Sequence, residues 1–181
     1  MLVRELNRLR SRWWIVPAGM FLAVRLATYL EFWLIRRNRP GENALALITQ
    51  WDAGWNSVIA SRGYVAMEGV GTSVDRWMTL AFFPVVPRSA RLVHDITGWS
   101  VEKSGIAVSV LCGLAAAVVL WRLVQRRFGD EVASDSLLLL LVAPYAFVFS
   151  KFYTEGPTLL VVALCFTALD RRWWIAAGAF A

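Results

Sequence analysis

The sequence predicts an all-α, polytopic membrane protein with about four transmembrane helices and the start of a fifth. Of the 181 residues, 58% are hydrophobic, and the mean hydropathy of +0.53 is above the range of an ordinary soluble domain. The apolar residues are gathered in separate runs. The 19 lysines and arginines stand mostly at the ends of these runs, and no basic face with interleaved aromatic rings indicates nucleic-acid binding.

The first two predicted spans are the longest apolar runs. A helix needs about 20 residues to cross roughly 30 Å of hydrocarbon. Residues 13–35 reach this length although Arg25 and Glu31 interrupt them, and residues 104–120 contain no charge. A cleaved secretory signal is the alternative for the N-terminus, because a basic start precedes an apolar run. We favour a retained span, because apolar sequence continues beyond Arg25 and no small-residue cleavage site is evident.

The third and fourth predicted spans are shorter. Residues 136–149 and 157–169 flank a polar link, residues 150–156, and we interpret the two runs as a helical hairpin. Residues 173–181 have the composition of a fifth span but are too few to cross a membrane. We therefore expect residues 1–181 to be the N-terminal part of one transmembrane domain, and we expect this part alone to be inactive.

Basic clusters predict the orientation. They lie before the first run, after the second and after the fourth, so four spans place them on one side, which the positive-inside rule assigns to the cytoplasm. We therefore expect residues 1–12 in the cytoplasm of a multi-pass protein of the bacterial plasma membrane. The loop of residues 36–103 then lies on the opposite face, and it is long enough to escape the rule despite its own basic start. The clusters are Arg4, Arg8, Arg10 and Arg12; Arg122, Arg126 and Arg127; and Arg171 and Arg172.

The predicted external loop contains two segments suited to a membrane interface. Residues 44–60 repeat apolar side chains at three- and four-residue steps, which predicts an amphipathic helix. Residues 77–93 combine aromatic, apolar and arginine residues, and we expect Pro84 and Pro87 to break this stretch. The loop is therefore predicted to lie along the bilayer surface.

Two acidic residues fall on that external face. Asp52 stands between Trp51 and Trp55 in the loop, and Glu155 stands in the link. Capping of the following helix is the alternative for Asp52, because aspartate is a favoured N-cap residue. The alternative for Glu155 is a solvated charge near the N-terminus of the fourth helix. Because the topology places both residues on one face, we predict that they meet in one site.

The remaining polar residues give weaker signals. Arg25 and Glu31 lie in a span, where ionisable residues either pair within the bundle or form a site, and their spacing does not favour pairing with each other. His94 has no second ligand at metal-binding spacing, so we interpret it as structural. Cys112 and Cys165 fall inside predicted spans as packing residues. We expect no metal and no cofactor.

A single carboxylate suits one class of group transfer. When a sugar is carried on a lipid phosphate, the phosphate leaves without a general acid, and one carboxylate can act as the base on the acceptor hydroxyl. Glycoside hydrolysis usually needs two carboxylates, because an alkoxide is a poor leaving group. We expect the tryptophans beside Asp52 to limit its hydration and to face the sugar. The cationic candidates for the phosphate are Arg62, Arg76, Arg88, Arg91 and Lys151.

Three motifs occur in a fixed order. "WDAGWNSVIASRGY", "AFFPVVP" and "FSKFYTEGP" together resemble the motif set of GT-C membrane glycosyltransferases, most closely the PIG-V-type mannosyltransferases and their bacterial relatives. The resemblance covers roughly residues 13–170. It implies a polyprenyl-phosphate-sugar donor, with mannose as the sugar, and inverting transfer to an acceptor on the non-cytoplasmic face. The acceptor is a glycolipid, a polysaccharide or a protein.

The resemblance also implies roles for individual residues. Asp52 matches the first-loop aspartate taken as the catalytic base. Two positions depart from the pattern, because Asn56 replaces an aromatic residue and Gly156-Pro157 replaces a serine and an apolar residue. The matching residues are Trp51, Gly63 and Tyr64 in the first motif, Phe83 and Pro84 in the second, and Tyr153 and Glu155 in the third. The expected substrate-binding residues are Trp51, Trp55, Arg62, Tyr64, Arg76, Arg88, Lys151, Tyr153 and Glu155.

Two other function classes remain open at this stage. A transporter component would place its polar residues near the membrane midplane, often in repeated halves, whereas here they cluster in an outer loop. A non-catalytic membrane subunit would tolerate replacement of Asp52 by asparagine. The enzyme hypothesis predicts loss of transfer from that change.

Overall fold

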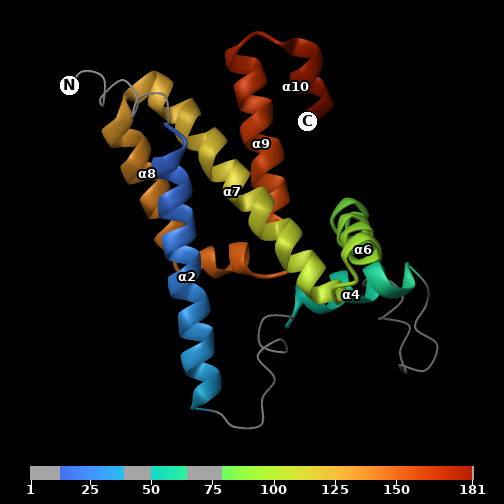
Figure 1. The fold of residues 1–181 in the computed structure, drawn as a ribbon. Coiled ribbons are helices and arrows are strands. Elements are labelled where there is room, and N and C mark those ends of the chain that lie inside the picture. The colour runs from blue at the N-terminus through green and yellow to red at the C-terminus, as the bar shows by residue number, and fades with distance from the viewer. Residues whose placement is uncertain (1–12, 39–49, 65–78, 181) are drawn as a thin grey trace.

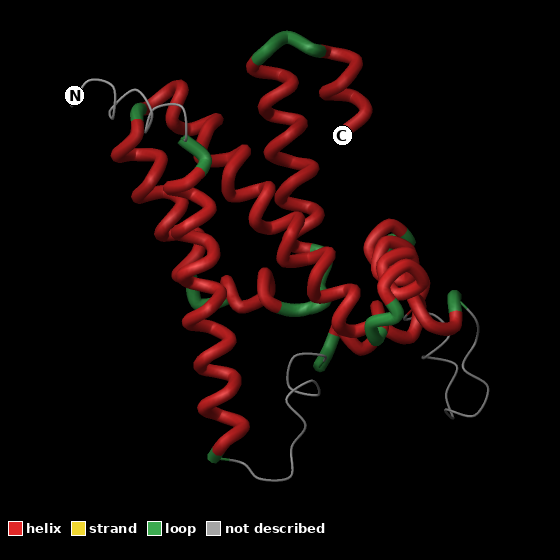
Figure 2. The backbone as a smooth tube through the Cα atoms, in the orientation of Figure 1, coloured by secondary structure: helices red, strands yellow, loops and turns green. Residues whose placement is uncertain are grey.

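The computed structural model describes residues 13–38, 50–64 and 79–180, and every regular element in these segments is a helix (Figures 1 and 2). The all-α class is therefore confirmed for the part of the chain that is described. The elements are α2 (Ile15–Arg37), α4 (Asp52–Arg62), η1 (Thr79–Ala81), α6 (Val85–Thr97), α7 (Val101–Phe128), α8 (Asp130–Val142), η2 (Ala146–Ser150), α9 (Glu155–Asp170) and α10 (Trp174–Phe180).

Two of the described helices, α2 and α7, are long and apolar enough to cross a membrane. Helix α2 covers the first predicted span from residue 15 onward, and α7 contains the second and extends beyond residues 104–120 at both ends. Ser100 begins α7 by accepting a hydrogen bond from the backbone N–H of Lys103 at 3.4 Å, and Gly129 ends it at a φ of 89°. Helices α8 and α9 have 13 and 16 residues, which is short of a full span, so the number of four spans stays a prediction.

The third apolar run is not one helix over residues 136–149, as was predicted. Helix α8 begins earlier, at Asp130, and ends at Val142, and η2 follows after a turn. Pro144 explains the break, because a proline disfavours helical geometry at the residue before it, and Ala143 has an extended ψ of 146°. In Figure 1, η2 runs from α2 and α8 toward the lower end of α7, and α4 lies beside that end of α7.

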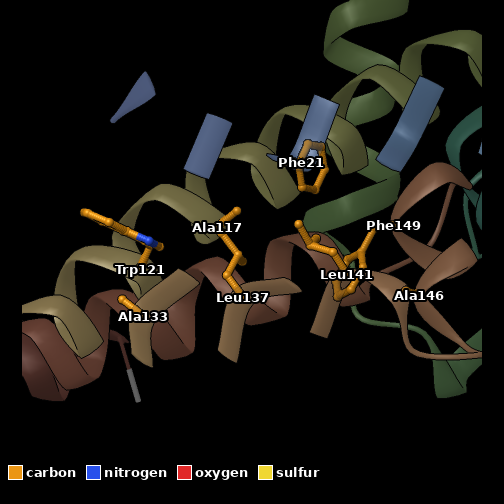
Figure 3. Close-up of a cluster of buried hydrophobic side chains, with 8 residues drawn as sticks. All are labelled: Phe21, Ala117, Trp121, Ala133, Leu137, Leu141, Ala146 and Phe149. Atoms are coloured by element: carbon orange, nitrogen blue, oxygen red, sulfur yellow. The ribbon is translucent and has the colours of Figure 1, made fainter. Parts of the chain in front are cut away.

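A buried apolar cluster holds α2, α7, α8 and η2 together. Figure 3 shows its side chains following α8, from Trp121 and Ala133 at one end to Ala146 and Phe149 at the other. The cluster therefore fixes the corner where η2 leaves α8. Its members are Phe21, Ala117, Trp121, Ala133, Leu137, Leu141, Ala146 and Phe149.

The two helices of the predicted loop contact each other and α7, but their starts differ from the predictions. Helix α4 begins at Asp52, and residues 44–49 of the expected helix lie outside the described residues. The second stretch is broken at Pro84, which separates η1 from α6, but Pro87 does not break it. Pro84 occupies the N-cap position of α6 and Pro87 lies in its first turn, where backbone N–H groups have no partner within the helix.

Candidate active site

The link between η2 and α9 lies against the start of α4. The Asn56 side-chain amide donates to the carbonyl of Phe152 at 3.1 Å, and the Tyr153 hydroxyl donates to the carbonyl of Gln50 at 3.3 Å. On the other side, the Ser109 hydroxyl of α7 donates to the carbonyl of Tyr153 at 2.7 Å. The structure thus brings the first and third motifs together, although about a hundred residues of sequence separate them.

Two glycines allow the link to lie this close to α7. A Cβ atom on Gly105 would lie 2.3 Å from the ring of Phe152, and a Cβ atom on Gly156 would lie 2.4 Å from the carbonyl oxygen of Ser109. Neither distance is possible for a real side chain, so the close approach depends on both glycines. Gly156 was one of the two departures from the GT-C pattern, and the geometry explains it.

Asp52 is the first residue of α4 and its side chain is exposed. The N-cap position belongs to Trp51, and no side-chain capping bond is made there, so capping does not explain Asp52. Trp51 has a φ of 66°, a conformation that costs a non-glycine residue about 1–3 kcal/mol and that occurs often at functional sites. The expected shielding of Asp52 is wrong for Trp51, which is itself 81% exposed, while Trp55 is half-buried.

Tyr153 connects Asp52 electrostatically to Glu155. Burial raises the pKa of the Tyr153 phenol, and the negative charges of Asp52 and Glu155 raise it further. Burial is also the main reason that the pKa of Glu155 is raised, with a further contribution from the charge of Asp52. The link lies outside the two helices that qualify as spans. Two carboxylates and a phenol therefore share one electrostatic environment.

This environment makes the stability of the protein depend on the charge of Glu155. Because the pKa of Glu155 is raised in the native state, folding favours the protonated acid. The stability that Glu155 contributes is therefore fully present below its ordinary pKa of about 4.3 and is lost as the pH rises through the native pKa. Glutamine resembles the protonated acid and does not titrate. We therefore expect the melting temperature of Glu155→Gln minus that of wild type to increase as the pH rises from about 4 to about 7. Glu131→Gln, at the exposed start of α8, is the matched control. A difference between Glu155→Gln and wild type that is constant across this range would contradict the prediction.

Lys151 is the buried cation of the link. Its side chain is only 8% exposed, and its ammonium lies 5.1 Å from the ring centre of Phe147 and 5.6 Å from that of Tyr153. Burial lowers the pKa of Lys151. It forms no ion pair with any carboxylate of the described residues. A buried ammonium that is surrounded by aromatic rings can accept an anionic ligand.

The other cationic candidates are placed differently. Arg62 and Arg88 are exposed on α4 and α6. Arg91 pairs with Asp95 at 2.9 Å on the same helix. Arg76 lies outside the described residues. Among the candidates that the structure describes, only Lys151 lies over the ring of Tyr153, whose pKa is raised by the charge of Asp52.

The second motif meets the end of the first. Tyr64 donates its hydroxyl to the carbonyl of Phe82 at 2.6 Å, and Tyr64, Phe83 and Pro84 line a shallow surface pocket. Gly63 ends α4 with a φ of 76°, which allows the chain to turn toward this contact. Phe83 is 80% exposed. Tyr64 therefore belongs to a neighbouring surface.

Sequence reasoning missed the roles of Asn56 and Ser109. Asn56 was noted only as a departure from the GT-C pattern, yet it is fully buried and its amide donates a hydrogen bond to the link. The sequence carried no signal for either role, because each side chain bonds a backbone carbonyl of the link. His94 lies on α6, where its ring nitrogen Nδ1 contacts the carbonyl of Trp99. In the described segments, no group of three or more potential ligands could hold a metal.

The sequence profile of the dolichyl-phosphate-mannose-protein mannosyltransferase family matches residues 83–181. The chain belongs to this family. The family is of the GT-C type, so the GT-C mannosyltransferase type expected from the motifs is confirmed. No curated protein and no solved structure matches the chain.

Membership of this mannosyltransferase family supports glycosyl transfer by a membrane-embedded protein. It also supports a sugar donor of the lipid-phosphate class and an acceptor for glycosylation. The matched residues include the link and all the helices from α6 to α10. The first two-thirds of the predicted loop, residues 36–82, precede the match. Asp52 and α4 precede the match. Their assignment to the site therefore rests on the contacts with the link.

Proposed function

We propose that this protein transfers a mannosyl group from a polyprenyl-phosphate donor to an acceptor hydroxyl on the non-cytoplasmic face of the membrane, with inversion. The observation that carries the proposal is the meeting of Asp52 with the link. The exposed carboxylate would act as the base, the buried ammonium of Lys151 would bind the phosphate and Glu155 would contact the sugar, and Tyr153 contacts or couples to all three. The family supports the donor class.

The reaction is a displacement at the anomeric carbon. Asp52 accepts the proton of the acceptor hydroxyl while the hydroxyl oxygen forms a bond to that carbon. The bond between the carbon and the phosphate oxygen breaks, and its electron pair leaves with the polyprenyl phosphate. Attack from the side opposite the phosphate inverts the configuration. Because Asp52 is exposed, an acceptor hydroxyl can reach it from the aqueous side.

Lys151 would bind the phosphate. Its ammonium is largely removed from water, where its attraction to an anion is stronger than at an open surface. As the bond breaks, negative charge grows on the phosphate, so this attraction is larger in the transition state than in the donor complex. Glu155 and Tyr153 would hydrogen-bond the sugar hydroxyls, and the indoles of Trp51 and Trp55 would pack on the sugar ring.

The exposed Arg62 and Arg88 would serve another step. On an open surface each can attract an anionic lipid headgroup without desolvation. We therefore assign these two arginines to the approach of the donor rather than to the transfer step. Tyr64, in its surface pocket, would contact the acceptor or a more distant part of the donor.

The two rival functions have less support. A transporter pathway through α2 would use Arg25 and Glu31, but the guanidinium of Arg25 is hydrogen-bonded to the α8–η2 corner and Glu31 is exposed. A non-catalytic subunit would tolerate Asp52→Asn, whereas the enzyme would lose transfer.

The donor assay tests the proposed function. Membranes from cells that express the complete gene are supplied with radiolabelled polyprenyl-phosphate-mannose, polyprenyl-phosphate-glucose or a mannose nucleotide. We expect labelled product from the lipid-linked mannose, with inverted anomeric configuration by nuclear magnetic resonance. Membranes from cells without the gene are the control. Transfer that is fastest from the nucleotide sugar, or that retains configuration, would contradict the proposal.

A further inference from the structure

Among the described residues, one buried cation lies outside the proposed site. Arg25 is 2% exposed and lies in the middle of α2. Its guanidinium donates hydrogen bonds to the carbonyl of Leu141 at 3.0 Å, to the hydroxyl of Ser150 at 3.2 Å and to the carbonyl of Ala146. It also lies near the rings of Phe21 and Phe149, at 5.5 and 5.9 Å.

These contacts explain how α2 tolerates a charge. Helix α8 ends at Val142, so the carbonyl of Leu141 has no partner within its own helix. The guanidinium supplies that partner, and its positive charge is favourable at the negative end of the α8 dipole. Glu31 was the other charge expected in this span, but no ion pair between it and Arg25 is formed. Arg25 is therefore a cap for a broken helix.

The same contacts reach the first residue of the link. Ser150 receives a hydrogen bond from Arg25 on its hydroxyl and one from the Tyr29 hydroxyl on its carbonyl, the latter at 3.0 Å. Both donors come from α2, one turn apart. Ser150 is fully buried and is followed directly by Lys151. Helix α2 thus fixes the point from which the site's cation and Tyr153 extend.

We propose that Arg25 and Tyr29 are positioning residues of the glycosyl-transfer site. They hold Ser150 so that Lys151 and Tyr153 stand opposite Asp52, and neither touches a reacting atom. This inference rests on the proposed function, because the residues it positions are those assigned to the donor phosphate and the sugar. It predicts that changes inside the membrane span alter the kinetics of folded enzyme.

The size of the effect follows from the geometry. A displacement of about 1 Å in a reacting group can lower the rate by about 100-fold. Arg25→Ala removes the three hydrogen bonds that the guanidinium donates, and we expect kcat of the folded fraction to fall by about 10- to 100-fold. Tyr29→Phe removes a single hydrogen bond and should lower kcat by about two- to tenfold. Arg25→Lys keeps the charge but not the fork of donors, so it should restore only part of the loss.

The experiment needs a readout that does not depend on catalysis. We would place Lys151→Cys in a background in which Cys112 and Cys165 are alanine, and measure how fast a small charged thiol reagent labels it. The link is buried, so labelling should be slow. Arg25→Ala and Tyr29→Phe should each raise the labelling rate severalfold, because the link is then held less firmly. In parallel, kcat and KM for the donor are measured with Lys151 intact, per amount of folded protein.

Matched controls separate positioning from general damage. Tyr145→Phe makes the same chemical change as Tyr29→Phe on an exposed residue of the same corner, and Arg36→Lys matches Arg25→Lys at the exposed end of α2. Both should keep wild-type kcat, KM and labelling. Tyr29→Phe keeps the test decisive if Arg25→Ala does not fold.

The outcomes distinguish the two proposals. Faster labelling together with lower kcat in Tyr29→Phe supports positioning. Unchanged labelling and kcat in the folded Arg25 and Tyr29 variants would overturn it, even where the yield of protein falls. If Asp52→Asn retained transfer, the proposed function would fail, and an unchanged labelling rate would still refute the positioning of the link by α2.

Discussion

Asp52→Asn is expected to lower the rate of mannosyl transfer by about 100- to 10,000-fold, the usual contribution of a positioned general base. Asparagine keeps the size and the position at the start of α4 but cannot accept the acceptor's proton. Binding of the donor should change little, because Lys151 and the sugar contacts remain. The measurement is the initial rate of transfer in membranes that contain equal amounts of wild-type or variant protein.

Asp95→Asn is the matched control for this loss. Asp95 is an exposed aspartate on α6 that pairs with Arg91 in an i, i+4 ion pair, and such pairs contribute only about 0.3–0.5 kcal/mol. This variant should therefore keep wild-type transfer. Equal rates in Asp52→Asn and wild type would assign the chain a non-catalytic role.

Gly156→Ala is expected to impair both folding and transfer, although it adds a single methyl group. The new Cβ would lie 2.4 Å from the Ser109 carbonyl oxygen and 3.2 Å from the Gly113 backbone nitrogen, so α9 must move away from α7. Overpacking of this kind costs about 1–3 kcal/mol. The same movement shifts Glu155 and strains the bond from Ser109 to Tyr153, so kcat should fall by about 100-fold. Thermal melting in detergent and the transfer assay measure the two effects.

Gly19→Ala supplies the comparison. Gly19 lies in the interior of α2, and a Cβ atom there would meet no atom within 4 Å. Alanine is favoured over glycine in a helix by about 1 kcal/mol, so Gly19→Ala should leave stability unchanged or raise it. Similar behaviour of the two variants would mean that the close approach of α9 to α7 does not matter.

The fold could be predicted from the sequence where length and hydropathy decide the structure. The apolar runs that became α2 and α7 needed no other information. The third run was misjudged because hydropathy does not distinguish a helix from an apolar turn, and the effect of Pro144 on Ala143 is a matter of backbone sterics. The start of α4 was also wrong, because Trp51 has a φ of 66° and the helix begins after it, and the periodicity of apolar residues carries no signal for a positive φ at a non-glycine residue.

The site was predictable at the level of motifs but not of contacts. Charge and topology indicated that Asp52 and Glu155 would approach each other, and the structure brings their segments together. Choosing Lys151 over the arginines required knowledge of burial. Asn56 and Arg25 bind backbone carbonyls about a hundred residues away, and a carbonyl leaves no signature in the sequence. Their roles became visible only with the fold.

A cross-linking measurement tests most directly whether Asp52 and the link form one site on the outer face. Gln50→Cys and Tyr153→Cys, in the background without Cys112 and Cys165, are treated in intact cells with a short, membrane-impermeant bifunctional maleimide. Because the Tyr153 hydroxyl reaches the Gln50 carbonyl, we expect linked peptides containing both positions by mass spectrometry. Linkage that forms only after the cells are permeabilised, or linkage that does not form at all while each single cysteine reacts, would contradict the account.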